Sequence, residues 1–284
     1  MSRIAYVNGQ YVSHRDGAVH IEDRGYQFGD GVYEVVLVHN SELIDCEGHI
    51  GRLERSLSKM DMAMPVSRPC LIMILRRMIS LNYMKKGILY LQVTRGVAPR
   101  DHKYPAHSTP ALVMTAKHLR YNEVISDDGV KAITVPDERW ARRDIKTTQL
   151  LANCRAKQLA AEQGAYEAIM VMPDGSVSEG SSSNVWILTA DGELVTRKAS
   201  NDILNGITRQ TITRIASERQ VHIVNRDFTV NEMLGAEEVF VTSATSIVTP
   251  VTEIDGVVIK DGKIGILSAA LRADYFEKSD RIAL

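Results

Sequence analysis

The chain has 284 residues, of which 44% are hydrophobic and 24% charged, and its 34 basic side chains nearly balance 35 acidic ones. These values are typical of a globular protein and exclude a disordered, collagen-like or disulfide-dense chain. The balance of charge also removes the simplest electrostatic argument for nucleic acid or an anionic membrane as a partner. Small molecules are the favoured partners, and the length predicts two domains.

Nothing in the sequence predicts a membrane segment or a secretory signal. The longest purely apolar run, Cys70 to Leu75, is far shorter than the roughly 20 residues that span a bilayer. The N-terminus turns polar within a few residues and lacks the apolar core of a signal peptide. Cys46, Cys70 and Cys154 are widely spaced and form no CxxC pattern, as in proteins of a reducing compartment. We therefore expect a cytoplasmic protein.

Residues 1–118 predict an α+β domain. Strands are expected at Ile4 to Val7, Tyr11 and Val12, Val32 to Val38, Ile88 to Thr94 and Ala111 to Thr115. The Asn8-Gly9 pair predicts a hairpin. Apolar residues at spacings of three and four predict two helices, one with Ile50, Leu53, Leu57 and Met60 and one with Leu71, Leu75, Met78 and Ile79. We expect Gly87 to cap the second helix.

A polar stretch, residues 119–128, predicts the link to a second domain over residues 129–284. Strands are expected there at Val130 to Val135, Ala168 to Met172, Val185 to Leu188 and Val239 to Thr242. Helices are expected at Thr147 to Gln163, at Ile207 to Arg219 and from Ser268 onward. The pairs Asp255-Gly256 and Asp261-Gly262 predict hairpin turns.

Several common sites of chemistry are not supported by the sequence. The segment Phe28 to Gly31 has two glycines but lacks the third that a dinucleotide-binding loop requires. The eight histidines show no HExxH pattern and have no cysteine partner at ligand spacing, so no metal site is predicted. The Gly-x-Ser-x-Gly signature of many serine hydrolases is also missing.

Lys146, at the start of the helix expected from Thr147, is the first candidate for chemistry. A lysine in such a place is ordinarily a solvated surface group. The apolar neighbours Ile145 and Leu150 favour partial burial, which would promote the neutral, nucleophilic amine. The residues by themselves leave both interpretations open.

Three polar turns in the second half are candidate binding segments. Ser178 to Asn184 is rich in serine and carries one carboxylate, Glu179, which suits either a surface turn or the close approach of a flat ligand. Asn205 to Arg209 opens a helix whose first N–H groups suit either an ordinary cap or a phosphate. Thr242 to Ser246 is a hydroxyl-rich turn of the same ambiguous kind.

In this order, these segments resemble the fold type IV pyridoxal-phosphate enzymes, and among them the D-amino-acid aminotransferases. The resemblance covers almost the whole chain. It rests on five stretches: Glu22 to Glu34, Gln92 to Gly96, Asp144 to Lys146, Glu179 to Asn184 and Gly206 to Arg209. Each is modest alone, but agreement across all five is specific.

The resemblance implies a two-domain α+β fold, with a smaller N-terminal α/β domain and a larger C-terminal domain that has a β-barrel-like core and binds pyridoxal 5'-phosphate. It implies that Lys146 forms the Schiff base, or internal aldimine, with this cofactor and later acts as the base that moves the α-proton. Glu179 resembles the family carboxylate that pairs with the pyridine nitrogen and keeps it protonated.

The resemblance also implies a set of phosphate-binding residues, because the family uses an arginine of the first long helix, a helix start and a hydroxyl turn. In this sequence they are Arg52, Ile207, Thr208 and Ser243. Ala244 stands where the family often has a hydroxyl, so only a backbone N–H is expected to remain there. Leu204 corresponds to the residue that supports one face of the ring, although it is equally well interpreted as a core leucine.

The substrate assignment depends on Arg100 and His102, which follow the stretch Gln92 to Gly96. In D-amino-acid aminotransferases an Arg-x-His at this place, together with a tyrosine equivalent to Tyr33, binds the substrate α-carboxylate, and the loop comes from the partner subunit. Without the resemblance, this would be interpreted as a solvated basic loop. The other residues expected at the substrate are Val35, Tyr90 and Arg139.

These implications define the expected activity. A cytoplasmic homodimer would transaminate D-amino acids, converting D-alanine and 2-oxoglutarate to pyruvate and D-glutamate. The alternatives of the same fold are an L-branched-chain aminotransferase and an aminodeoxychorismate lyase, and Arg100 and His102 favour the D-specific enzyme. A cofactor-binding protein without turnover is a further alternative, against which Lys146 and Glu179 argue.

Overall fold

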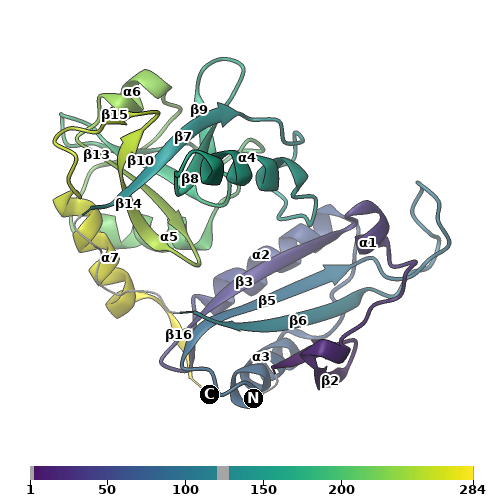
Figure 1. Ribbon diagram of the computed structural model, residues 1–284. Coiled ribbons are helices and arrows are strands. Elements are labelled where there is room, and N and C mark those ends of the chain that lie inside the picture. Colours follow the sequence, from purple (N-terminus) through teal and green to yellow (C-terminus); the bar gives the residue numbers. More distant parts are fainter. Residues whose placement is uncertain (1–2, 120–127, 284) are drawn as a thin grey trace. The chain divides into compact units, whose positions relative to one another are not determined.

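The computed structural model describes residues 3–119 and 128–283 (Figure 1). Contacts within the chain divide it into two compact units. The first comprises Met1–Arg120, Ile145–Gln149 and Asp280–Leu284, and the second comprises Tyr121–Asp144 and Leu150–Ser279. Residues 120–127, the greater part of the predicted link 119–128, lie outside the described residues.

Among the described residues of the first unit, seven strands form an antiparallel sheet in the order β16-β4-β3-β5-β6-β1-β2. The strands are β1 (Ile4–Val7), β2 (Gln10–Ser13), β3 (Gly31–His39), β4 (Glu42–Ile44), β5 (Lys86–Thr94), β6 (Ala111–His118) and β16 (Arg281–Ile282). The helices are α1 (Arg24–Phe28), α2 (Cys46–Lys59) and α3 (Arg68–Leu81), with a 3-10 turn at His14–Asp16.

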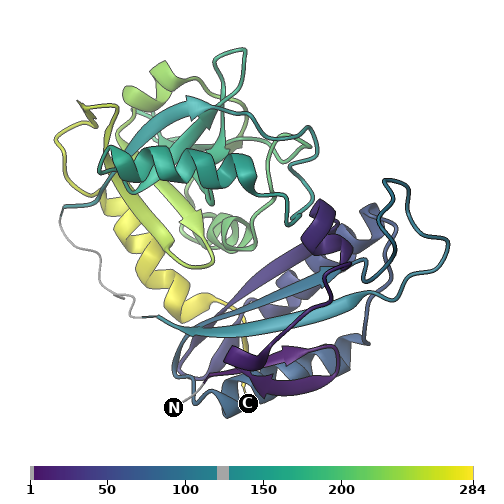
Figure 2. The ribbon, with the colours of Figure 1, turned by 45° about the vertical axis from the view of Figure 1, so that its right-hand side comes forward.

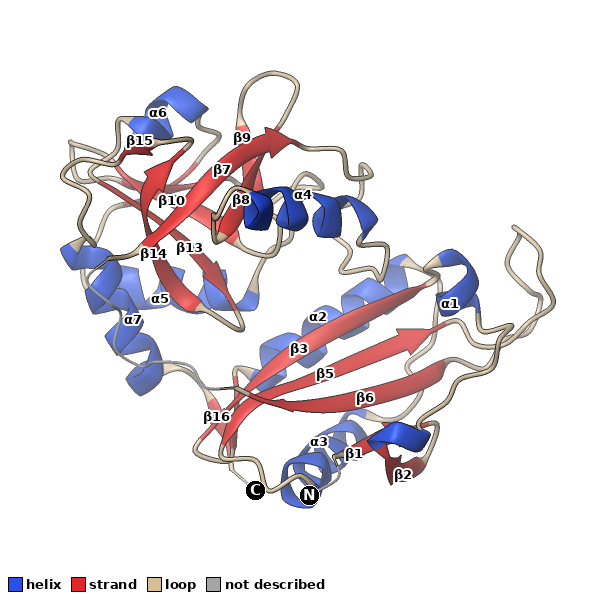
Figure 3. Ribbon diagram, viewed as in Figure 1, coloured by secondary structure: helices blue, strands red, loops and turns tan. Residues whose placement is uncertain are grey.

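Helices α2 and α3 bury their apolar stripes against one face of this sheet (Figure 3). Leu53 and Leu57 of α2 and Leu75 of α3 join Leu89 and Leu91 of β5 in a single core. Residues three and four apart share one side of a helix, and alternate residues share one face of a strand. The two predicted helices and the strand predicted over Ile88 to Thr94 are thereby confirmed.

Two turn predictions in this unit have opposite outcomes. Asn8 and Gly9 connect β1 and β2 with φ angles of 45° and 96°, so the predicted hairpin is confirmed. The predicted cap at Gly87 is wrong, because α3 ends at Leu81 and Gly87 lies inside β5. A side chain is excluded at Gly87, since its Cβ would come within 2.4 Å of the Lys117 carbonyl oxygen on β6.

The second unit is built on a nine-stranded sheet over the described residues, with β15 paired to β14 beside the main path β12-β11-β10-β13-β14-β7-β8-β9. Its strands are β7 (Val130–Pro136), β8 (Glu167–Val171), β9 (Val177–Gly180), β10 (Asn184–Leu188), β11 (Leu194–Thr196), β12 (Ile223–Asn225), β13 (Glu238–Ser243), β14 (Ile247–Ile254) and β15 (Val257–Val258). Its helices are α4 (Leu151–Glu162), α5 (Ile207–Glu218), α6 (Val230–Leu234) and α7 (Ile266–Lys278).

This second sheet curls: β9, the last strand of the path, contacts β10, which is the third strand from the other end. Helix α4 packs on β7 and β8 through Ala156 and Ala160, while α5 and α7 pack on each other and on β13 (Figure 2). The apolar strands expected here are confirmed, and Asp255-Gly256 forms the turn between β14 and β15. Asp261-Gly262 is a turn without a hairpin, because the chain continues into α7 and not into a strand.

The segment around Lys146 differs from its prediction in two ways. The helix expected from Thr147 begins only at Leu151, because residues 146–148 bond to the edge of β3. The Tyr33 N–H donates to the Lys146 carbonyl at 2.9 Å, and Val32 and Thr147 form an isolated β-bridge. For this reason Ile145–Gln149 packs with the first unit, although the sequence places it inside the second domain.

Candidate functional site

Lys146 is held by backbone pairing and directed at an aromatic ring of the first unit. Its carbonyl accepts the Tyr33 N–H, and its half-buried side chain places Nζ 4.3 Å from the centroid of the Tyr33 ring. The ring face attracts a cationic amine and lets a neutral one pack without loss. Lys146 is therefore not a fully solvated surface lysine.

Tyr33, Val35 and Tyr90 share one face of the sheet, because Tyr33 and Val35 alternate along β3 and Val35 pairs directly with Tyr90. The rings of Tyr33 and Tyr90 lie 5.5 Å apart, and the Tyr90 hydroxyl donates to Oε1 of Gln92 at 2.6 Å. Burial, with the nearby Tyr33 hydroxyl, raises the pKa of Tyr90 to about 12. Tyr90 is therefore a hydrogen-bond donor throughout the physiological pH range.

Between these residues along β3, Glu34 points to the opposite face and forms a buried ion pair. Its carboxylate accepts from Nε and Nη2 of Arg52, both at 2.7 Å, and contacts Nδ1 of His49 at 2.7 Å. Burial alone would raise the pKa of Glu34, but the charge of Arg52 and the hydrogen bonds from Arg52 and His49 lower it to about 2. Arg52, a predicted phosphate ligand, is thus held rigidly on α2 by a carboxylate that the sequence did not single out.

Arg100 and His102, the two predicted carboxylate-binding residues, lie together on the loop that follows β5. Both are exposed and both rest on the ring of Phe28 at the end of α1. The Arg100 guanidinium carbon lies 4.7 Å from the ring centroid, and the His102 ring centroid lies 5.8 Å from it. The structure therefore brings this predicted pair together.

In the second unit, Glu179 lies on β9 and is almost completely buried, with 4% of its surface exposed. Oε1 accepts from Nη1 of Arg139, while Oε2 accepts from the Leu204 N–H at 3.0 Å and from Nδ2 of Asn184 at 3.2 Å. The surface-turn interpretation of Ser178 to Asn184 is wrong, because every residue of the segment except Ser182 is buried.

Ser181 and Ser183, close to Glu179, are buried, and a second carboxylate binds them. Glu167 at the start of β8 accepts from the hydroxyls of Ser181 and Ser183, the latter at 2.8 Å. The Ser182 hydroxyl donates to the same carboxylate at 3.3 Å. Buried hydroxyls require such partners. Glu167 therefore holds in place the turn that leads from Glu179 into β10.

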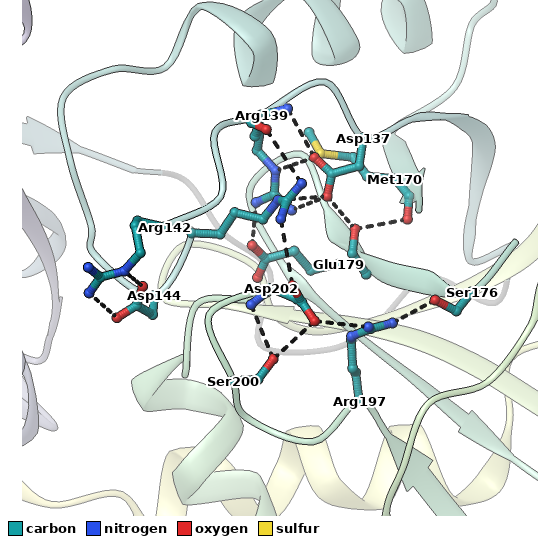
Figure 4. Close-up of polar contacts among 12 residues, drawn as sticks. Asp137, Arg139, Arg142, Asp144, Met170, Ser176, Glu179, Arg197, Ser200 and Asp202 are labelled. Carbon is teal, nitrogen blue, oxygen red and sulfur yellow. Dashed lines mark hydrogen bonds and ion pairs between the residues drawn. The ribbon is translucent and has the colours of Figure 1, made fainter. Parts of the chain in front are cut away.

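Arg139 sits between two carboxylates in the second unit (Figure 4). Its Nε and Nη2 bind Asp137 at 3.0 and 2.7 Å, and its Nη1 binds Glu179. Burial alone would lower the pKa of Arg139, but the charges of Glu179 and Asp137 raise it above its ordinary value. The pKa of Asp137 is lowered, since the hydrogen bonds and charge of Arg139 outweigh its burial. Glu179 thereby faces a permanent positive charge.

The predicted phosphate residues of this unit lie at a helix start and a turn. Ile207 and Thr208 are buried at the N-terminus of α5, and Gly206, its N-cap residue, offers no side-chain cap. A Cβ on Gly206 would come within 2.2 Å of Oδ1 of Asn184, so the Asn184 side chain can approach this backbone as closely as it does only because the residue is glycine. The free N–H groups of a helix start are suited to anions.

Ser243 ends β13 and bonds within its own turn. Its Oγ contacts Oγ of Ser246 at 2.8 Å and Oγ1 of Thr245 at 3.2 Å. Ala244 is half-buried between them. Two hydroxyls, on Thr245 and Ser246, thus stand beside the position where Ala244 lacks one.

A family model, amino-transferase class IV, matches residues 31–254 of the chain. The chain belongs to the class IV aminotransferase family. It is 44% identical to the D-alanine aminotransferase of Listeria monocytogenes (strain 10403S), over 97% of this chain and 96% of the relative. It is 42% identical to the D-alanine aminotransferase of Bacillus licheniformis over 92% of both chains. The resemblance stated from the sequence is confirmed.

Solved structures confirm the fold of this class IV aminotransferase. A branched-chain amino acid aminotransferase of Escherichia coli superposes with a TM-score of 0.90 at 21% identity, covering 98% of this chain and 95% of that one. A hypothetical aminotransferase from Mycobacterium tuberculosis, solved in its PLP-bound form, gives a TM-score of 0.81 at 23% identity, covering 96% and 97%. In the described part of this aminotransferase, no helix is long and apolar enough to cross a membrane.

Besides Glu34 and Glu167, sequence reasoning missed three further residues that hold the predicted ones in place. Asp137 and Asn184 bind Arg139 and Glu179, and Phe28 carries the Arg100 loop. Asn184 ends the stretch Glu179 to Asn184, and its position directly after three serines at the start of an apolar strand was a usable signal. Phe28 lies inside the stretch Glu22 to Glu34, but its partners are on another loop, and Asp137 gave no such signal although its partner Arg139 is only two residues away.

Proposed function

We propose that this aminotransferase acts on D-amino acids, transferring the amino group of D-alanine to 2-oxoglutarate to give pyruvate and D-glutamate. The observation that carries the proposal is the joint placement of Arg100 and His102 on Phe28. Two cationic or hydrogen-bonding groups on one exposed loop suit a carboxylate. The D-alanine aminotransferases that match almost the whole chain support the same substrate.

The residues present suit pyridoxal 5'-phosphate. Glu179 is a buried carboxylate that Arg139, Asn184 and the Leu204 N–H stabilise in its charged form, as a protonated pyridine nitrogen requires. The N-terminus of α5, which has no side-chain cap, suits a phosphate dianion. When bound, this cofactor supplies an aldehyde for the amino group and a ring that withdraws electrons from the α-carbon.

Lys146 is the residue that we assign to covalent attachment of the cofactor and to movement of the α-proton. Backbone pairing with β3 fixes its main chain, and its half-buried side chain reaches the ring of Tyr33. A neutral amine is both a nucleophile toward an aldehyde and a base of suitable strength. Tyr33, beside Nζ, limits where the amine can move.

Binding of the cofactor is assigned to the residues that the resemblance implies. Glu179 holds the proton on the pyridine nitrogen, and Leu204 supports the ring. The N–H groups of Ile207 and Thr208, with Ser243, the Ala244 N–H and Arg52, bind the phosphate. Because Glu34 already pairs with Arg52, we expect the arginine to contribute a fixed hydrogen-bond geometry more than net charge.

Substrate binding is assigned to Arg100, His102 and Tyr33 for the α-carboxylate. Val35 and Tyr90 share the sheet face of Tyr33 and are assigned to the side-chain pocket. Arg139 acts through Glu179. We further propose a cytoplasmic homodimer in which the Arg100 loop serves the partner subunit. The three cysteines are all unpaired, which supports a reducing compartment.

The deciding experiment is a spectroscopic titration of the purified protein loaded with pyridoxal phosphate. D-Alanine is added to one sample and L-leucine or L-isoleucine to another. We expect D-alanine alone to convert the yellow, lysine-bound cofactor to the pyridoxamine form, and pyruvate to appear in equal amount.

Two other results would contradict the proposal. Conversion by the L-amino acids alone would identify a branched-chain aminotransferase and remove the roles of Arg100 and His102. Failure to acquire a visible band with added pyridoxal phosphate would contradict the cofactor assignment. Light scattering of the same sample tests the homodimer directly.

A further inference from the structure

The ring of Phe28 stands at the centre of the Arg100 loop. It contacts three cationic or aromatic groups: Arg24 with its guanidinium carbon 4.6 Å from the ring centroid, Arg100 at 4.7 Å and the His102 ring at 5.8 Å. Phe28 itself is half-buried at the end of α1, whereas Arg100 and His102 are exposed. An exposed arginine has several rotatable bonds, and an aromatic face is an effective way to restrict them.

The ring is itself held by a buried charged cluster. Asp30 accepts from Nε of Arg24 and from Nε of Arg95 through the same oxygen, both at 2.8 Å. Arg24 also donates to the carbonyl of Asp101, at 2.7 Å, and so binds the loop between its two functional residues. The guanidinium carbon of Arg95 lies 3.6 Å from the ring centroid of Tyr104, further along the loop. Arg24 and Arg95 therefore contact the loop on both sides of His102, through the Asp101 carbonyl and the Tyr104 ring.

We propose that Phe28 is a positioning residue for substrate recognition: its ring orients Arg100 and His102 so that they receive a carboxylate together. This inference rests on the proposed function, because it assumes that Arg100 and His102 bind the α-carboxylate. It adds a specificity-determining residue that does not itself touch the substrate. An apolar side chain of similar volume fills the same space but offers no π-face to the guanidinium.

The test compares Phe28→Leu with the unchanged enzyme, both loaded with pyridoxal phosphate. We expect the KM for D-alanine to rise about fivefold while kcat changes less than about twofold, because ground-state carboxylate binding is affected. Phe28→Tyr keeps the ring and is expected to restore the KM. Tyr26→Leu is the matched control, since Tyr26 lies on the same short helix with 76% of its surface exposed.

A double-mutant cycle separates positioning from a general structural effect. Phe28→Leu is repeated in a variant that carries Arg100→Ala and His102→Ala, and kcat/KM is measured at low D-alanine. If Phe28 acts through these two residues, its substitution has almost no further effect there. The same loss in both backgrounds would overturn the inference. Phe28→Met provides the same comparison if the leucine variant does not fold.

The outcomes also distinguish this inference from the proposed function. Normal kinetics of Phe28→Leu, with a raised KM for Arg100→Ala, would reject the positioning role and leave the D-amino-acid activity in place. An unchanged KM for Arg100→Ala would reject the carboxylate assignment and the positioning role together. Absence of D-alanine transamination by the unchanged enzyme would reject both the function and the inference.

Discussion

Nη1 of Arg139 donates a hydrogen bond to Oε1 of Glu179 across 40 positions of sequence, and both side chains are buried. Such a pair is worth little as a source of stability, because burying two charges costs about as much as their attraction returns. Its value is electrostatic: the arginine keeps Glu179 charged, and Asp137 on its other side fixes the arginine. A carboxylate held in this way can keep a proton on a heterocyclic nitrogen.

Replacing Glu179 by glutamine should lower kcat/KM for D-alanine by roughly 10²-fold, because the amide keeps the shape but loses the charge that favours the protonated ring. Steady-state kinetics with excess pyridoxal phosphate measures this. Glu277→Gln, an exposed carboxylate of α7, is the control. Equal activities of the two variants would show that the charge of Glu179 is not used.

Lys146→Ala should abolish covalent attachment of pyridoxal phosphate. Borohydride reduction followed by peptide mass analysis should find the cofactor on Lys146 in the unchanged protein and nowhere in the variant. Lys157→Ala is a matched control, because Nζ of Lys157 also lies over a tyrosine ring, 4.5 Å from the centroid of Tyr166. Labelling of Lys157, or labelling that survives in Lys146→Ala, would disprove the assignment.

The ion pair of Glu34 predicts a specific acid sensitivity. The pKa of Glu34 is lowered from 4.5 to about 2 in the folded protein, so its stabilising effect is complete above pH about 4.5 and is lost as the pH falls toward 2. At about 1.4 kcal/mol per pKa unit, this amounts to about 3 kcal/mol of unfolding free energy.

Urea unfolding at pH 7 and pH 3 checks this prediction. The loss of stability between these pH values should be smaller in Glu34→Gln, although that variant is less stable at pH 7 because Arg52 loses its partner. Glu54→Gln is the control, since its carboxylate pairs with Arg68 with 40% of its side chain exposed. An unchanged pH dependence in Glu34→Gln would refute the assignment of this sensitivity to Glu34.

Gly206→Ala should weaken binding of pyridoxal phosphate about tenfold, because the new Cβ would meet Oδ1 of Asn184 at 2.2 Å and displace either the amide or the start of α5. The backbone at Gly206, with φ of −60°, accepts alanine without strain, so the effect is steric. Titration of the cofactor-free protein with pyridoxal phosphate measures the dissociation constant.

Gly235→Ala provides the comparison for this substitution. A Cβ added at Gly235 would lie 3.5 and 3.9 Å from the nearest atoms, which are backbone oxygens, and these are ordinary contact distances. Equal dissociation constants for Gly206→Ala and Gly235→Ala would show that the start of α5 does not hold the phosphate.

Local sequence patterns were sufficient to predict the turns, helices and strands that depend only on neighbouring residues. The Asn8-Gly9 turn, the apolar stripes of α2 and α3 and the alternation along β5 follow from backbone sterics and from the spacing of apolar residues. The motifs around Lys146 and Glu179 were sufficient to recognise the family, and the relatives confirm it.

The tertiary structure alone decided which distant groups meet. Lys146 was expected at a helix start, but hydrogen bonds to β3 hold its segment extended. The serines after Glu179 look like a surface turn until Glu167, on another strand, binds them. In the sequence Phe28 is one apolar residue among many, and only the fold shows that Arg100 and His102 pack on its ring. Each of these contacts joins segments that only folding brings together, and no local periodicity records such a pairing.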